Sequence, residues 1–204
     1  RFFLQVIFIF LFVNTIDIEI ETTKINFIDN LLSNSYINNL FVTFCLMVLI
    51  NGGNFIDGLN GLILKYYVVI TFVILFYLNT FLLQDLEFFK NLTLILLVLL
   101  IFNIMGALYM GDSGAYLLSV LMGILLINFS SNNVSISPYL IILFFWYPCF
   151  ELLFSMLRRS FNEIKSYKPD TFHLHHLIFK KLGSFFGINN KLIIHGMTTI
   201  SINT

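Results

Sequence analysis

The chain has 204 residues, of which 58% are hydrophobic and only 11% are charged, and its mean hydropathy is +0.91. A soluble domain of this length has too little polar surface to cover so many apolar side chains, so the composition indicates a protein whose solvent is lipid. The 11 Lys and Arg residues balance 11 Asp and Glu residues. That balance argues against a nucleic-acid partner, because nucleic-acid binding normally requires a basic stripe.

Long apolar runs along the chain predict transmembrane helices, which need about 20 apolar residues each. The expected spans cover residues 2–13, 37–50, 62–83, 92–109, 116–129 and 138–157, with a further partial run from about residue 191. The second and fifth of these are short, so we expect them to include residues of the polar motifs beside them. The sequence therefore predicts an all-α, polytopic integral membrane helical bundle.

The two ends of the chain lie in apolar sequence, beginning at Arg1 and ending at Thr204. We therefore expect residues 1–204 to form a single but partial membrane domain, with N-terminal helices missing and the C-terminal end missing as well. Residues 2–13 are then the tail of a truncated span. They lack a small-residue cleavage site, so they do not indicate a signal peptide.

Charge is distributed unevenly over the predicted loops. The loop at about 158–190 is rich in basic residues: Arg158, Arg159, Lys165, Lys168, Lys180 and Lys181. The loops expected on the other side carry mainly acidic ones: Asp17, Glu19, Glu21, Asp29, Asp85 and Glu87, beside Lys24 and Lys90. Because basic loops stay inside the cell, the loops at about 51–61, 110–115 and 158–190 are predicted to be cytoplasmic, in the inner (plasma) membrane.

The first of these three loops contains a polar cluster in which Asn51, Asn54, Asp57 and Asn60 recur at every third position. A carboxylate flanked by carboxamides suits hydrated Mg²⁺ and a sugar or phosphate group. The glycines between them allow a ligand or another backbone to approach closely. The alternative is a Gly/Asn turn between two helices, with Asp57 as a helix cap.

The second loop contains Gly111-Asp112-Ser113-Gly114, just before the fifth span. An Asp or Ser at the start of a helix is often only an N-cap, and that alternative stays open. The functional interpretation rests on Asp112 being a second carboxylate on the same side of the membrane as Asp57. One Asp would bind a metal ion while nearby amides bind phosphate.

The third loop contains three histidines, His173, His175 and His176, after the pair Arg158-Arg159. A short helix would place His173 and His176 on one face. Imidazole and guanidinium groups suit a diphosphate or its leaving group. A zinc site and solvated histidines without a role are the two alternatives. The zinc site lacks support, because no Cys lies nearby and there is no His-Glu-x-x-His motif.

Four motifs in one order give the chain a resemblance to a known family. They are Asn51-x-x-Asn54-x-x-Asp57-Gly-Leu-Asn60-Gly-Leu62, Met110-Gly-Asp112-Ser-Gly-Ala-Tyr-Leu-Leu118, Pro148-x-x-Glu151 leading to Arg158-Arg159, and Pro169-Asp170-x-x-His173-Leu-His175-His176-Leu177. The chain resembles the polyprenyl-phosphate N-acetylhexosamine-1-phosphate transferases (glycosyltransferase family 4), the group that includes WecA, TagO and MraY. The resemblance covers about residues 38–182, and the His-x-His-His form is similar to the WecA-like branch.

The resemblance implies transfer of an N-acetylhexosamine-1-phosphate, with GlcNAc as the expected sugar, from a UDP-sugar to undecaprenyl phosphate. It also implies that UMP is released and that the product begins a cell-envelope glycan such as lipopolysaccharide or a cell-wall polymer. Mg²⁺, or Mn²⁺ in its place, would be held by Asp112 and Asp57. The implied catalytic residues are Asp57, Asp112 and His175. The implied substrate-binding residues are Asn54, Asn60, Arg158, Arg159, His173 and His176. Membrane lipid is a further partner, and a homodimer is compatible with the resemblance.

Three departures from the family pattern affect the expected activity. The family's upstream aspartate pair would lie before Arg1, the second Asp of the usual Asp-Gly-x-Asp-Gly is Asn60, and residues 106–108 are uncharged. We therefore expect the 204-residue segment to be nearly inactive alone, as an incomplete or decayed transferase would be. The alternative from another class is a transporter or channel that uses intramembrane Asp and His residues.

Overall fold

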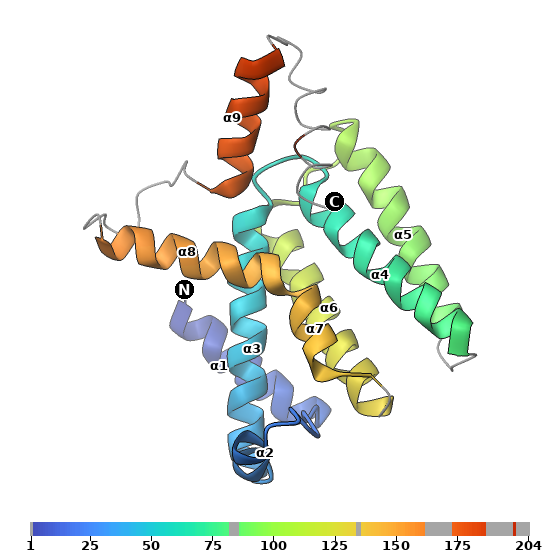
Figure 1. The fold of residues 1–204 in the computed structure, drawn as a ribbon, viewed down its shortest axis with the longest axis vertical. Coiled ribbons are helices and arrows are strands. Elements are labelled where there is room, and N and C mark those ends of the chain that lie inside the picture. Colours follow the sequence, from blue (N-terminus) through green and yellow to red (C-terminus); the bar gives the residue numbers. More distant parts are fainter. Residues whose placement is uncertain (1, 82–85, 134–135, 162–172, 187–197, 199–204) are drawn as a thin grey trace. The chain divides into compact units, whose positions relative to one another are not determined.

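The computed structural model describes residues 2–81, 86–133, 136–161, 173–186 and 198. Within these residues all regular secondary structure is helical, which confirms the all-α prediction. The helices, labelled in Figure 1, are α1 (Phe2–Ile16), α2 (Asn26–Leu32), α3 (Ser35–Ile56), α4 (Leu62–Phe81), α5 (Leu86–Ile104), α6 (Gly111–Asn132), α7 (Pro138–Phe144), α8 (Trp146–Phe161) and α9 (Leu174–Phe186).

Three of these helices, α3, α5 and α6, are long and apolar enough to cross a membrane by themselves. The bent pair α7 and α8 makes a fourth crossing if it is counted as one broken span, while α1 and the Leu62–Leu78 part of α4 are shorter apolar helices. This count covers only the described residues. The protein is therefore a polytopic helical membrane protein, as the sequence predicts.

The predicted span over residues 138–157 is not one continuous helix, because the chain bends by 60° between α7 and α8. Pro148 explains the position of the bend. A proline ring collides with the carbonyl group four residues earlier, which here belongs to Phe144, the last residue of α7. Within α8 the same proline lies in the first turn, where a missing N–H group is tolerated.

The fourth predicted span, 92–109, also differs from the helix that forms, because α5 begins earlier and ends at Ile104. Gly106, with φ of +73°, ends it in a Schellman arrangement. The Gly106 N–H donates to the carbonyl of Asn103 over 3.1 Å, and the Ala107 N–H donates to the carbonyl of Phe102 over 2.9 Å. Residues 105–110 consequently form a loop before α6. The helices α3 and α6 do extend into their flanking motifs, as expected.

The described chain divides into two compact units. Unit 1 comprises Arg1–Gly53 and Tyr116–Phe154, and unit 2 comprises Asn54–Ala115 and Ser155–Thr204. In unit 1, a buried cluster joins α1, α3 and α6; its members are Val13, Ile18, Val42, Leu46 and Ile127. The carboxamide of Asn38 binds the segment between α1 and α2 to α3, because it accepts from the N–H of Ile20 and donates to the carbonyls of Ile20 and Leu32.

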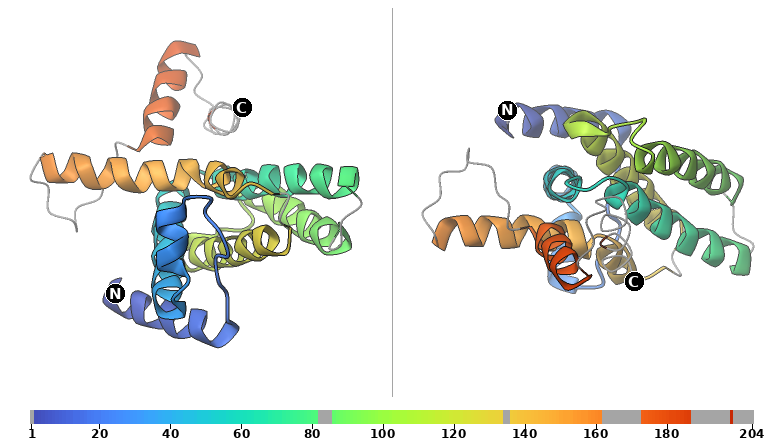
Figure 2. Two further views of the ribbon diagram at one scale, coloured as in Figure 1. Left: turned by 60° about the horizontal axis from the view of Figure 1, so that its bottom comes forward. Right: turned by 90° about the horizontal axis from the view of Figure 1, so that it is seen from above.

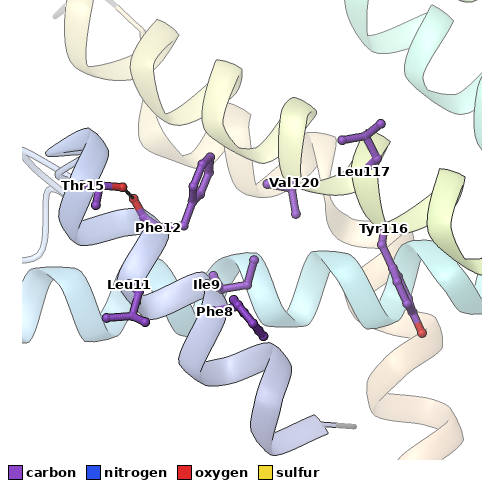
Figure 3. A pocket seen from close by; sticks show the side chains of 8 residues that line it. All are labelled: Phe8, Ile9, Leu11, Phe12, Thr15, Tyr116, Leu117 and Val120. Carbon is purple, nitrogen blue, oxygen red and sulfur yellow. Dashed lines mark hydrogen bonds between the residues drawn. The ribbon is translucent and has the colours of Figure 1, made fainter.

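Apolar hollows open within unit 1. One, of about 480 Å³, lies between α1 and α6, and Figure 3 shows side chains that line it, among them Phe8 and Phe12 from α1 and Tyr116 and Val120 from α6. A second, of about 360 Å³, is lined by the segment between α1 and α2, by parts of α3, α6 and α7, and by the free thiols of Cys45 and Cys149. The first is lined almost wholly by hydrocarbon, and the second is mainly apolar with Glu21, Thr22 and Ser130 among its lining residues, so the apolar surfaces of both suit contact with lipid tails.

Unit 2 contains α4 and α5, which pack side by side in Figures 1 and 2. The buried core of α4 includes Leu62, Ile63 and Tyr67. At the start of α4, Gly61 has φ of +81°, and a Cβ atom there would lie 3.0 Å from Cγ1 of Ile104 at the end of α5. A residue without a side chain is therefore required where the first polar motif meets α5.

Candidate active site

The first polar motif forms the end of α3 and the turn to α4. Asn54 lies in the last turn of α3, and Asp57 and Asn60 lie in the turn that follows Ile56. All three side chains are half-buried. Asp57 comes after the C-terminus of one helix and several residues before the next, so it is not placed as the N-cap of α4.

The second polar motif forms the start of α6. Gly111, with φ of +60°, is the first residue of the helix, and Asp112 follows it in the first turn with its side chain exposed. Asp112 therefore lies inside the helix rather than at its cap. A carboxylate in this position interacts favourably with the positive end of the helix dipole.

A side chain that the sequence interpretation did not select connects these two motifs. Asn103 of α5 is buried, with 4% of its surface exposed. Its Oδ1 accepts a short hydrogen bond from the N–H of Gly61, and its Nδ2 donates to the carbonyl of Leu108 over 2.8 Å. Asn103 thus fastens the α3–α4 turn to the loop before α6. Its signal in the sequence was a carboxamide at the end of an apolar span, where an unpaired polar group is costly.

The carboxyl groups of Asp57 and Asp112 lie close enough to influence each other. The pKa of Asp57 is raised from its ordinary value of 3.8 to about 7, first by burial of the carboxyl group and second by the charge of Asp112. Two like charges near each other in a partly desolvated turn disfavour ionisation of the more buried one. The structure therefore places the two acidic motifs, 55 positions apart in the chain, in one electrostatic site.

The raised pKa of Asp57 makes the stability of the metal-free protein depend on pH. The folded protein binds this proton more tightly than the unfolded chain does, so the stabilisation is complete below about pH 4 and is lost as the pH rises to about 7. In the presence of EDTA, we expect the thermal unfolding temperature to fall over this interval. Asp57→Asn should flatten the fall, whereas Glu87→Gln, on the exposed first turn of α5, should not. Identical curves for wild type and Asp57→Asn would contradict the raised pKa.

The histidine segment lies against the first motif. The ring of His173, which is 6% exposed, stacks on the ring of Phe55 with 5.2 Å between centroids and 29° between planes. The guanidinium carbon of Arg159 lies 6.0 Å from the centroid of the same Phe55 ring. His173 and His176 have their ring centroids 6.0 Å apart. The structure thus brings His173 and Arg159 to Phe55, the residue beside Asn54, and His176 to His173.

A short helix at the histidines, which the sequence interpretation considered, does form. α9 begins at Leu174, and the N–H of Leu177 donates to the carbonyl of His173 over 3.1 Å. Arg158 lies in the last turn of α8, half-buried. The backbone of His175 is in α9, but its side chain lies outside the described residues, as do Lys165, Lys168 and Asp170.

The acidic pair suits a divalent cation. Among the described residues no group of three or more His, Cys, Asp and Glu side chains is arranged to hold a metal ion. A site here would therefore offer the carboxylates of Asp57 and Asp112 and leave the remaining coordination positions to substrate oxygens and water. Mg²⁺ is bound in this way, by one or two carboxylates together with substrate phosphates. A cation held by the two groups would also favour the ionised form of Asp57, whose pKa is raised first by burial and second by the charge of Asp112.

Comparison with known proteins identifies the family. A model described as glycosyl transferase family 4 matches residues 1–130, which is more than half of the chain. The chain belongs to glycosyl transferase family 4. The family match includes both acidic motifs and ends before Arg158 and the histidines.

A curated relative supports the same family. The undecaprenyl-phosphate alpha-N-acetylglucosaminyl 1-phosphate transferase of Thermotoga maritima is 24% identical over 150 residues, which are 73% of this chain and 46% of the relative. The chain thus spans about half the length of this curated relative. No solved structure matches the chain. The predicted family is confirmed, and the protein is a membrane-bound member of it.

Proposed function

We propose that this protein transfers an N-acetylhexosamine-1-phosphate, most simply GlcNAc-1-phosphate, from a UDP-sugar to undecaprenyl phosphate and releases UMP. The observation that carries the proposal is the approach of Asp57 and Asp112 within one unit that also contains the Phe55, His173 and Arg159 contacts. The family match and the name of the Thermotoga maritima relative support it. The product would start a cell-envelope glycan such as lipopolysaccharide or a cell-wall polymer.

The proposed reaction is a phosphoryl transfer between two phosphates. An oxygen of the acceptor phosphate attacks the sugar-bound phosphorus of the donor, and the bond from that phosphorus to the UMP oxygen breaks, so UMP leaves. A phosphate monoester has a second pKa near 6, so most of the acceptor is already dianionic at pH 7 and needs no strong base. Catalysis of this kind depends on alignment and on neutralisation of negative charge.

We assign the roles within the site from the chemistry of its side chains. Asp112 and Asp57 would hold Mg²⁺, or Mn²⁺ in its place, and the bound ion would neutralise charge on the diphosphate. The basic side chains would bind the diphosphate and the departing UMP; these are Arg158, Arg159, His173, His175 and His176. The carboxamides of Asn54 and Asn60 would hydrogen-bond the donor beside Asp57.

The proposal includes an orientation of the protein in the membrane. We place it in the inner (plasma) membrane, with the α3–α4 turn, the loop before α6 and the basic segment from Arg158 onward in the cytoplasm. The basic residues of this segment favour the cytoplasmic side. The acidic segment between α1 and α3 then lies on the opposite side, which agrees with its excess of carboxylates.

The direct test uses membranes that contain the protein expressed from its complete reading frame. Incubation with UDP-GlcNAc and undecaprenyl phosphate should yield lipid-linked GlcNAc-phosphate and an equal amount of UMP. EDTA should abolish both products, and added Mg²⁺ or Mn²⁺ should restore them. A screen of other UDP-N-acetylhexosamines identifies the sugar. Ion or proton flux in liposomes without any sugar-phosphate transfer would instead support a transporter and overturn the proposal.

A further inference from the structure

Phe55 is one of 25 phenylalanines, and its ring lies against two of the predicted site residues. It lies in the last turn of α3, between Asn54 and the turn that contains Asp57. Its ring contacts groups from two other parts of unit 2, because His173 precedes α9 and Arg159 lies in the last turn of α8. One apolar ring therefore joins three polar segments that are far apart in the sequence.

The two contacts of this ring have a defined chemistry. Phe55 and His173 form a stacked aromatic pair at 5.2 Å and 29°, a geometry in which ring contacts are favourable beyond simple burial. The guanidinium of Arg159, 6.0 Å from the ring centroid, lies at the outer limit of a cation–π contact. A Leu side chain at position 55 would fill much of the same space but would provide neither contact.

We propose that Phe55 is a positioning residue: its ring holds His173 and Arg159 beside the turn that carries Asp57. The inference rests on the proposed function, because the groups being positioned are those that would bind the donor diphosphate. His173 is buried and its carbonyl accepts the first backbone hydrogen bond of α9, so fixing its ring also fixes the start of that helix and the adjacent His176. Phe55 thereby links the acidic and basic halves of the site without touching the substrate.

The first test measures the contact itself and needs no enzymatic activity. Thermal unfolding of the complete gene product in detergent is compared for wild type, Phe55→Leu, His173→Leu and the double variant. If the rings stack, the double variant should lose less in unfolding temperature than the sum of the two single losses, because each single variant already removes the shared contact. Additive losses would overturn the inference, whatever the protein catalyses.

The second test separates positioning from general packing. Phe55→Leu should lower kcat/KM for the UDP-sugar by roughly tenfold, the upper range for loss of one aromatic pair, whereas Phe55→Tyr and Phe55→Trp should remain within about twofold of wild type because they keep an aromatic face. The matched control is Phe88→Leu. Phe88 is also in unit 2 and also pairs with an aromatic ring, that of Phe89 at 5.6 Å, but it lies at the start of α5. The Phe88→Leu variant should keep the wild-type kcat/KM for the UDP-sugar.

The outcomes of the two tests distinguish the inference from the proposed function. Equal activity of Phe55→Leu and Phe55→Tyr would overturn the positioning role, even if the protein proves to be the expected transferase. If the variants show non-additive losses in unfolding temperature but the wild-type protein transfers no sugar phosphate, the proposed function is overturned. Phe55 would then still be established as the residue that holds the histidine segment. Coupled losses together with rescue by Tyr and Trp would support both.

Discussion

Asp112→Asn is expected to reduce sugar-phosphate transfer by at least about 100-fold, the scale observed for loss of one preorganised electrostatic contact at a reacting group. Asn has nearly the same shape as Asp but no negative charge. The variant therefore keeps the first turn of α6 and removes half of the acidic pair. Because Asp112 is exposed, the change should have little effect on folding.

The measurement is the initial rate of UMP release in membranes at saturating UDP-sugar, normalised to the amount of protein. Glu87→Gln is the matched control, because it also removes one exposed carboxylate from the first turn of a helix in unit 2 and should keep the wild-type rate. A wild-type rate in Asp112→Asn would exclude Asp112 from the metal site. An equal loss of rate in Glu87→Gln would show that the rate depends on the total charge of the protein rather than on the acidic pair.

The apolar runs and the polar motifs were predictable from the sequence, because both depend on local residue types. A carboxylate at the end of an apolar span is energetically costly and is therefore usually functional, which singles out Asp57 and Asp112 from the sequence alone. The Gly106 turn that ends α5 was not anticipated, although glycine at that position is its usual signal. The break between α7 and α8 was missed because the run from 138 to 157 is apolar at most positions, with Glu151 as its one charged residue, and Pro148 within it was not interpreted as a break.

The partners of the site residues were harder to predict. The position of Phe55 between Asn54 and Asp57 is visible in the sequence, but its role is not, since that role arises from contacts with residues more than 100 positions away. Asn103 did carry a signal, because a carboxamide at the end of an apolar helix needs hydrogen-bond partners. Which partners it has depends on how α5 meets the α3–α4 turn, and that is a property of the fold.

Gly52→Ala is expected to cause the largest loss of stability. Gly52 lies in α3 within the first motif, and a Cβ atom there would stand 2.3 Å from the carbonyl oxygen and 2.7 Å from the carbonyl carbon of Pro148. These are backbone atoms at the start of α8, held by the bend at Phe145, so they cannot rotate away. Overpacking of this kind costs about 1–3 kcal/mol in the free energy of unfolding, and more where nothing can yield.

Gly123→Ala on α6 is the matched comparison. A Cβ atom there would also be too close to its neighbours, at 2.5 Å from Cδ2 of Leu46 and 3.0 Å from Cδ1 of Leu49, but both are ends of flexible side chains. Small shifts of those side chains, together with the about 0.5–1 kcal/mol by which Ala is favoured over Gly in a helix, should leave this variant near the wild-type stability.

Denaturant titration and thermal unfolding in detergent measure both glycine variants, with yield of folded protein as a further readout. If Gly52→Ala proved as stable as Gly123→Ala, the backbones of α3 and α8 would not approach as closely as the structure shows.

The comparison of these two variants also decides what a glycine in the Asn51–Gly61 motif does. The sequence allows either a ligand or another backbone to approach there, and at Gly52 the atom that would collide is a backbone oxygen of this same chain. Loss of folded protein, rather than loss of donor binding in a folded protein, is therefore the result that the packing predicts.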